Sequence, residues 1–211
     1  MQESACVLVV DDSTMSRRKM AMAVKNLGHE WIEAGSGEEA LDILQDRDVD
    51  LILLDIMMEP MAGWETLVAI KQNLETKDIP VMMLTAKQLT PQKAQEYGMY
   101  IEDYILKQVT HSELYAAIEG VISRRRQVAE DMTKAREGGF EDALINEYGR
   151  LVKSTEITKR LLKLLSSTYD LSDPSMKFSD DINIAIKSME TNMKFQEQRL
   201  IQIREIFSGA V

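Results

Sequence analysis

The chain has few of the residues that would indicate an extracellular or membrane protein. It has one cysteine, two histidines and four prolines among 211 residues. The single cysteine, Cys6, excludes an internal disulfide, fits a reducing compartment and lies in an apolar run, where it is read as a small core residue. No apolar run approaches the roughly 18 residues of a membrane span, and the first ten residues lack the basic start and cleavage site of a signal peptide. We therefore expect a cytoplasmic protein without a membrane span.

A strong excess of basic charge is also missing, although the charge is unevenly distributed. Residues 1–122 hold 10 Lys and Arg against 21 Asp and Glu, a net charge of −11, whereas residues 123–211 hold 15 against 14, a net charge of +1. This contrast predicts two parts with different roles, a domain over 1–122 and a helical region over 123–211. Neither part has the basic surface of a nucleic-acid-binding protein, so nucleic acid is an unlikely partner.

The first part alternates short apolar runs with segments of helical pattern. The predicted strands cover residues 5–10, 30–34, 51–54, 81–84 and 103–106. Helix starts are marked by Ser36 with Glu39, by Thr110 with Glu113, and by Thr90 ahead of a proline. Strands that alternate with helices predict an α/β fold with a parallel sheet covered on both faces.

The second part has a helical pattern throughout. A long helix is expected over about 111–137, ended by Gly138 and Gly139, and further helices over about 141–169 and 181–207. The last of them carries an apolar stripe with one polar member: Ile182, Ile186, Met189, Met193, Gln196, Leu200, Ile203 and Phe207. We expect an all-α hairpin or small bundle, and the stripe fits either packing within one chain or an interface between two chains.

Polar side chains stand where the predicted strands end. Asp11 and Asp12 follow the first strand, Asp55 the third, Thr85 the fourth and Lys107 the fifth. The carboxyl ends of parallel strands line one crevice, so these side chains should converge there. Three carboxylates close together favour a divalent cation, and Mg2+ (or Mn2+) prefers such oxygen ligands. A carboxylate can act as a nucleophile and form an acyl phosphate, with Asp55 the candidate and Thr85 and Lys107 holding the phosphoryl oxygens.

These residues lie in motifs that resemble the receiver domain of two-component response regulators. The matching segments are residues 9–13 (VVDDS), 53–58 (LLDIMM), 61–63 (MAG), 84–86 (LTA) and 104–107 (YILK). The resemblance implies a flavodoxin-like, doubly wound five-stranded sheet of order 2-1-3-4-5. It also implies a phosphoryl group received from a sensor histidine kinase on Asp55.

The same resemblance implies roles for further residues. The main-chain carbonyl of Met57 would complete the Mg2+ ligands beside Asp11, Asp12 and Asp55, and Thr85 and Tyr104 would act as the switch. Met57 and Lys87, each two residues beyond a site residue, would set the lifetime of the phosphoryl group. Neither is suited to orient an attacking water, so we expect slow autodephosphorylation by a signalling switch that is not an enzyme.

Three positions depart from the pattern of this family. Glu59 stands where proline is usual, Gln108 follows Lys107 where proline is usual, and residues 98–103 are about two residues longer. A cis bond before a residue other than proline costs about 3–4 kcal/mol, so we expect a trans bond before Gln108.

The output of the switch follows by elimination. A phosphotransfer bundle needs a histidine on a helix, but His29 and His111 lie within or beside the first domain. Residues 123–211 contain no glycine-rich loop or metal-ligand cluster that would indicate an enzyme. We therefore predict a helical output that binds a downstream protein target or forms a homodimer. The alternative is a transcription regulator that binds DNA through an unfamiliar helical domain.

Overall fold

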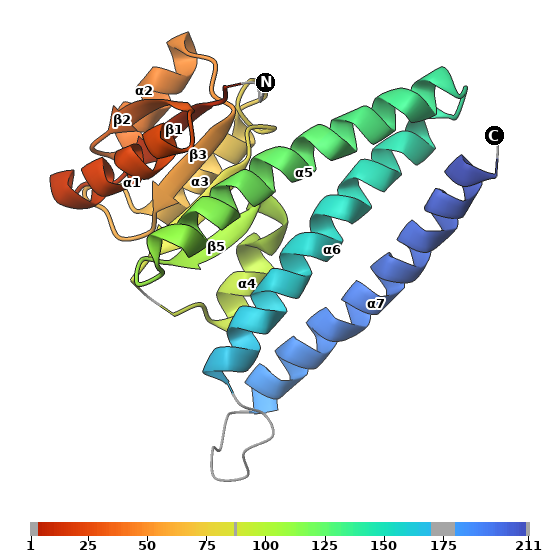
Figure 1. The fold of residues 1–211 in the computed structure, drawn as a ribbon. Coiled ribbons are helices and arrows are strands. Elements are labelled where there is room, and N and C mark those ends of the chain that lie inside the picture. Colours follow the sequence, from red (N-terminus) through yellow and green to blue (C-terminus); the bar gives the residue numbers. More distant parts are fainter. Residues whose placement is uncertain (1–3, 87, 170–179, 210–211) are drawn as a thin grey trace. The chain divides into compact units, whose positions relative to one another are not determined.

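The structure, a computed structural model, describes residues 4–86, 88–169 and 180–209 of the chain. Its five strands are β1 Cys6–Val10, β2 Glu30–Ala34, β3 Leu51–Asp55, β4 Val81–Thr85 and β5 Asp103–Leu106. They form one parallel sheet in the order β2-β1-β3-β4-β5 (Figure 1), which confirms the predicted α/β fold and strand order.

Two strands are one residue longer than predicted. Asp55 is the last residue of β3 and pairs with Leu84, and Thr85 is the last residue of β4 and pairs with Leu106. The pairing continues because the N–H of Ile56 donates to the carbonyl of Leu84 over 3.1 Å. The backbones of Asp55 and Thr85 are therefore fixed by the sheet itself, rather than by a loop.

Three helices join the first four strands, and the start of a longer helix follows the fifth. They are α1 Thr14–Asn26, α2 Gly37–Asp46, α3 Gly63–Gln72 and α5 His111–Glu137. The side chain of Ser13 caps α1 by accepting from the N–H of Ser16, and Ser36 caps α2 in the same way through Glu39. Each cap satisfies an N–H group that has no partner within its helix.

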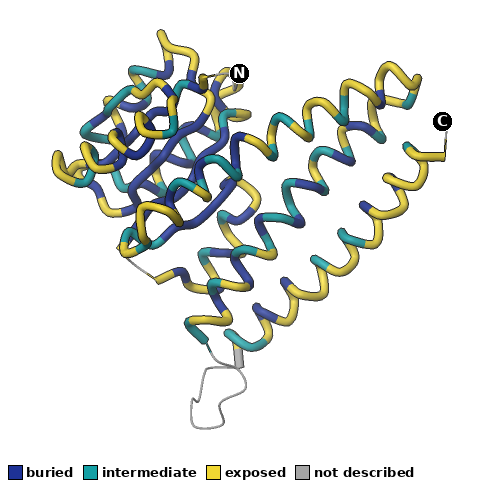
Figure 2. Tube along the Cα trace, in the orientation of Figure 1, coloured by how far each residue is buried: buried dark blue, intermediate teal, exposed yellow. Residues whose placement is uncertain are grey.

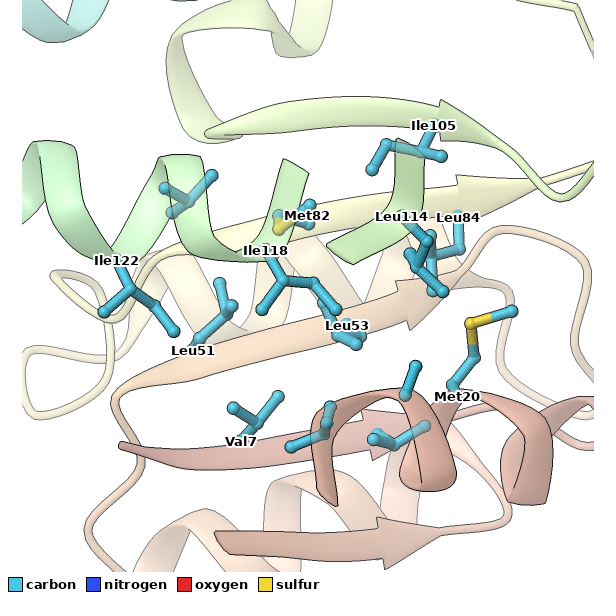
Figure 3. Packing of buried hydrophobic residues seen from close by; sticks show 14 of the residues in the cluster. Val7, Met20, Leu51, Leu53, Met82, Leu84, Ile105, Leu114, Ile118 and Ile122 are labelled. Atoms are coloured by element: carbon cyan, nitrogen blue, oxygen red, sulfur yellow. The ribbon is translucent and has the colours of Figure 1, made fainter. Parts of the chain in front are cut away.

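One face of the sheet packs against α1 and the first half of α5. Alternate residues of the central strands point to this face, among them Val7, Leu51 and Met82. Figure 3 shows Met20 from α1 and Leu114, Ile118 and Ile122 from α5 lying against these strands. The strands β1, β3 and β4 are almost fully buried, which is typical of a sheet covered on both faces.

The chain divides into two compact units. One comprises Met1–Gln88 with Tyr100–Ile122, and the other Leu89–Met99 with Ser123–Val211. The second unit includes α4 Pro91–Tyr97, the second half of α5, α6 Asp142–Thr168 and α7 Asp180–Ser208. The 3-10 turn Gly98–Tyr100 follows α4 directly.

The helix α4 packs within the second unit, although its sequence lies between two strands of the sheet. The side chain of Gln95 donates from Nε2 to the carbonyl of Ala185 in α7 over 3.3 Å. A Cβ atom on Gly98 would lie 3.1 Å from Leu161 Cδ1 in α6, so the two helices approach closely there. Residues 89–99 were expected to belong with 1–122, whereas these contacts group them with the C-terminal helices.

The core of the second unit lies between α5, α6 and α7. Tyr148 and Val152 of α6 meet Leu200 and Ile203 of α7, with partly buried side chains of α5 against them. The ring of Phe207 lies 5.5 Å from that of Tyr148, measured between centroids. The stripe predicted on α7 faces α6, and its residues Ile186, Met189, Leu200 and Ile203 are buried.

Polar contacts support this packing. Gln196, the polar member of the stripe, accepts a hydrogen bond from the hydroxyl of Ser154 in α6 over 2.9 Å. Arg199 binds both carboxylate oxygens of Glu147, over 2.7 and 2.8 Å.

Among the described residues, no helix is both long enough and apolar enough to cross a membrane.

Candidate functional site

Three aspartates meet at the carboxyl ends of β1 and β3. Asp11 and Asp12 directly follow β1, and Asp55 ends β3 beside it. Each offers one carboxylate oxygen, and these oxygens all lie within 4.8 Å of one another. Asp11 and Asp55 are buried, with 1% and 3% of their surface exposed, whereas Asp12 is exposed. The group is therefore open to solvent on the side of Asp12.

Lys107 joins the two buried carboxylates. Its Nζ donates to Asp11 Oδ2 over 2.6 Å and to Asp55 Oδ2 over 2.7 Å. Burial lowers the pKa of Lys107, but the hydrogen bonds and charges of the two aspartates outweigh burial and leave this pKa above its usual value. The ammonium thus stays charged and holds Asp55 in a fixed orientation.

The carboxyl group of Asp55 has a raised pKa. Burial is the largest cause, because it disfavours the charged form. Hydrogen bonds from Lys107 and from the N–H of Met57, which donates to Asp55 Oδ1 over 3.2 Å, act in the opposite direction. Asp55 is therefore a buried carboxylate held by two donors, and a cation that binds it would relieve part of the cost of burial.

The start of α1 supplies contacts to Asp11 that the sequence did not reveal. Ser16 donates from its hydroxyl to Asp11 Oδ2 over 2.5 Å, and the N–H of Ser13 donates to Oδ1 over 2.9 Å. Arg17 donates from Nη1 to the main-chain carbonyl of Asp11 over 2.7 Å and pairs with Glu33. The sequence could have indicated these contacts, because it places Ser16 and Arg17 on the first turn of the helix that follows the acidic pair.

Thr85 and Tyr104 interact with each other. Thr85 is fully buried at the end of β4, and its side chain contacts the hydroxyl of Tyr104 in β5. Burial raises the pKa of Tyr104 to about 12, and the hydrogen bond with Thr85 acts in the opposite direction. The ring of Tyr104 is buried and stacks on that of Trp64 in α3, with 6.4 Å between centroids. Trp64 was not among the predicted site residues.

The loop after β3 carries two further predicted features. The side chain of Met57 is 47% exposed. The main-chain N–H of Glu59 donates to Asp12 Oδ2 over 3.3 Å.

The predicted lifetime residue Lys87 lies outside the described residues. The only cis peptide bond among the described residues is Glu59–Pro60, so the bond between Lys107 and Gln108 is trans, as expected.

The donor set fits a small, hard divalent cation. Asp11, Asp12 and Asp55 provide oxygen atoms alone, and no histidine or cysteine belongs to the cluster. Mg2+ prefers such a set, with water in its remaining positions. Lys107 adds a fixed positive charge beside Asp55. A cation and an ammonium around one carboxylate form a site that can accept an anionic group.

Residues 7–119 match the response regulator receiver domain and make up more than half of the chain. The chain belongs to this receiver family. Receiver domains are signalling switches that bind Mg2+ at acidic residues and are phosphorylated by sensor histidine kinases. Residues 124–211, beyond the receiver, match a second family, described as Metanogen output domain 2.

Individual relatives are similar to this chain over the receiver. The phosphate regulon transcriptional regulatory protein PhoB of Pseudomonas aeruginosa is 37% identical over 118 residues, 56% of this chain and 52% of that protein. The chemotaxis protein CheY4 of Vibrio cholerae is 30% identical with a TM-score of 0.53, over 56% of this chain and 99% of that one. The N-terminal domain of a receiver protein from Methanoculleus marisnigri JR1 is 56% identical, over 57% and 98% of the two chains, with a TM-score of 0.49. The chain spans about half the length of PhoB.

Proposed function

We propose that Asp55 accepts a phosphoryl group from the phosphohistidine of a sensor kinase. A carboxylate oxygen of Asp55 forms a bond to phosphorus as the bond between phosphorus and the kinase histidine nitrogen breaks. The observation that supports this best is the position of Asp55, buried at the end of β3 with Lys107 bound to one oxygen and two further carboxylates within 4.8 Å. A buried carboxylate with a fixed cation beside it can act as a nucleophile toward an anionic group.

Mg2+, or Mn2+ in its place, is the cofactor that fits this reaction. Asp11, Asp12 and Asp55 would hold the ion together with the carbonyl of Met57. When bound, the ion would neutralise charge that otherwise keeps a phosphoryl group away from carboxylates. Lys107 holds Asp55 in place and carries a charge for one phosphoryl oxygen, because its pKa is raised. The hydroxyl of Thr85 is the donor for a second oxygen.

The switch would run through Thr85 and Tyr104. If the hydroxyl of Thr85 turns toward a phosphoryl group on Asp55, the hydrogen bond between Thr85 and Tyr104 breaks. Because Tyr104 is buried, the loss of this hydrogen bond favours a new contact or a movement of the ring. A local change of charge would thus be converted into a change of packing beside β5.

The output we propose is the helical region 123–211, which would contact a downstream protein target or a second copy of the chain. The packing of α4 supports this, because α4 lies in sequence between Thr85 and Tyr104 and yet contacts Ala185 and Leu161 of the helical unit. A displacement of the segment after Thr85 would therefore reach α6 and α7 directly. The proposed receiver remains residues 1–122 and the proposed output residues 123–211, with α4 of the receiver sequence packing in the unit of the output helices.

The proposed reaction is tested by labelling the full chain with acetyl phosphate in the presence of Mg2+. Wild type should incorporate one phosphoryl group per chain, and Asp55→Asn none. Asp48→Asn is the matched control, since Asp48 is an exposed aspartate away from the cluster and should leave labelling unchanged. Labelling of the Asp55→Asn chain to the wild-type level would refute the assignment.

A second candidate output is binding to DNA. It is favoured by the name of the PhoB relative, a transcriptional regulatory protein, although this chain covers only half of that protein. The net charge of +1 over residues 123–211 argues against it. Binding of the full chain to duplex DNA over a range of salt concentrations separates the two outputs, because phosphate contacts give affinity that falls steeply with salt.

A further inference from the structure

The helix α7 carries large apolar side chains on two opposite faces. Its inward face, which includes Leu200 and Ile203, is buried against α6. Its outward face carries Ile184, Phe195 and Ile206, which are 65%, 66% and 45% exposed. Figure 2 shows the buried and exposed stretches alternating along this helix. Single exposed apolar residues are common on protein surfaces, so the informative feature is how these three are arranged along the helix.

These three residues lie on one line. Each is 11 residues from the next, which is close to three turns of a helix with 3.6 residues per turn. The other positions on the line are Ser188, Thr191, Gln198 and Gln202. We define these seven residues, from Ile184 to Ile206, as the outer seam. They repeat at intervals of three and four residues, as in the contact line of a coiled coil.

The outer seam contains no charge. Nine of the 29 residues of α7 are Asp, Glu, Lys or Arg, but none of them belongs to the seam. The solvent-facing side of an amphipathic helix is normally where charged residues gather. An uncharged line with charges on its flanks is instead the arrangement of a helix that packs on both sides. It favours an uncharged partner over an acidic or basic one.

We infer that the outer seam is the surface on which a second copy of this chain docks, through its own α7 in the antiparallel direction. A two-fold interface requires that if one residue contacts another, the reverse contact also forms. Ile184 and Ile206 are equally distant from Phe195, so an axis at Phe195 pairs Ile184 with Ile206 of the second copy at both ends. The same axis places Phe195 against itself and Ser188 opposite Gln202.

Charges on the flanks of the seam favour this direction. In the antiparallel arrangement, Lys187 lies opposite Glu205 of the second copy, and the pair forms twice. Lys194 meets its own equivalent near the axis, where its long side chain can extend into water. A parallel arrangement would instead place Lys194 beside Arg199 of the second copy, also twice. The antiparallel pair therefore has the better charge complementarity.

Cysteine cross-linking of the full chain tests the direction. Cys6→Ala removes the natural thiol, and Ile184→Cys, Phe195→Cys or Ile206→Cys then adds one thiol on the seam. Positions 184 and 206 are about 33 Å apart along the helix. We expect disulfide dimers from Phe195→Cys alone and from a mixture of the other two chains, with little from either of those alone. Efficient cross-linking of Ile184→Cys with itself would show a parallel pair and overturn the inference.

Light scattering on the full chain tests the interface itself. Wild type should be a dimer, and Phe195→Glu should weaken dimerisation by about a hundredfold, because it places two charges in an apolar contact. Glu190→Lys, an exposed change on α7 outside the seam, should remain a dimer. Circular dichroism shows whether Phe195→Glu keeps its helices. A monomeric wild type, or a dimeric Phe195→Glu chain with its helices intact, would overturn the proposal.

This inference deepens the proposed homodimerisation of the output but does not depend on phosphorylation. Acetyl phosphate labelling of Asp55 should be the same in wild type and Phe195→Glu. A failure of the dimer therefore leaves the assignment of Asp55 untouched, and a failure of labelling leaves the dimer untouched.

Discussion

The main-chain N–H of Glu59 donates a hydrogen bond to the carboxylate of Asp12, over 3.3 Å. This contact ties the loop that carries Met57 to the acidic pair after β1. Receiver domains usually have proline at this position, and proline has no N–H to donate. The departure from the family pattern thus supplies a donor to one of the proposed Mg2+ ligands.

Glu59→Pro should weaken Mg2+ binding by about fivefold, since a hydrogen bond to a charged group contributes on the order of 1 kcal/mol or more. This change removes the hydrogen bond that joins the loop to the carboxylate of Asp12. Calorimetric titration of the full chain with Mg2+ measures the effect. Glu59→Gln is the control, because it keeps the N–H and removes only an exposed charge. If Glu59→Gln weakens binding as much as Glu59→Pro, charge and not the hydrogen bond is responsible.

Asp55→Asn should stabilise the protein at pH 7 in the absence of Mg2+, by roughly 1 kcal/mol. The pKa of Asp55 is raised mainly by burial, so the folded state holds the proton more tightly than the unfolded chain does. Its favourable contribution is complete in acid and is lost as the pH rises through the raised pKa. Asparagine does not ionise in this pH range, so the variant does not lose stability in this way as the pH rises. Urea unfolding at several pH values should show the difference shrinking toward acid, with no such trend for the exposed control Asp48→Asn.

Lys107→Met should have the opposite effect and lower the free energy of unfolding by about 2 kcal/mol. The change leaves Asp11 and Asp55 buried and close together without the ammonium that binds both. Adding Asp55→Asn to the same chain removes one of these charges and should restore more stability than Asp55→Asn adds to the wild type. If the two changes are simply additive in urea unfolding, Lys107 does not act on Asp55 as the geometry indicates.

The sequence predicted the sheet and, to within one residue, the ends of its strands, because both depend on patterns that are local. Apolar runs such as 51–54 and the polar residue after each run are visible one by one, and the parallel order follows from the alternation with helices. The convergence of Asp11, Asp55 and Lys107 is a consequence of that order. The contact of Glu59 with Asp12 uses a main-chain N–H, which the type of side chain does not encode.

The packing of α4 was equally hidden. It is a helix of seven residues with few buried side chains, so its sequence does not specify whether it covers the sheet or joins the C-terminal helices. Its grouping with α6 and α7 depends on close approach at Gly98 and on one side-chain bond from Gln95. The outer seam of α7 was not predicted for a related reason. Its apolar residues are 11 positions apart, whereas those of the inward stripe recur every three or four positions and dominate the pattern of the sequence.

Met57→Asn should shorten the lifetime of the phosphorylated protein by about tenfold, less than the roughly hundredfold or more of a well-placed general base. Met57 is half-exposed beside Asp55, and its thioether cannot hold an attacking water as an amide can. Decay of labelled protein after removal of acetyl phosphate, with Mg2+ present, measures the lifetime. Met57→Leu should decay like wild type. Loss of the wild-type label within seconds would contradict the expectation of a slow autodephosphorylation.

Gly98→Leu should uncouple the helical output from the phosphorylation site. A Cβ at this position already lies 3.1 Å from Leu161, so a leucine side chain has to push α4 away from α6. The backbone of Gly98 is helical, which makes the change one of packing rather than of chain conformation. In wild type, acetyl phosphate with Mg2+ should change amide hydrogen exchange at the start of α7 by about fivefold or more.

In Gly98→Leu, labelling of Asp55 should remain while this change in exchange disappears. Gly98→Ala is the matched control, since a shift of a few tenths of an ångström by the flexible Leu161 side chain accommodates it. Gln95→Ala should have an intermediate effect, because it removes only the bond to Ala185. If exchange in α7 responds to phosphorylation as strongly in Gly98→Leu as in wild type, α4 does not carry the signal, and α5, which is continuous from His111 to Glu137, becomes the connection to test.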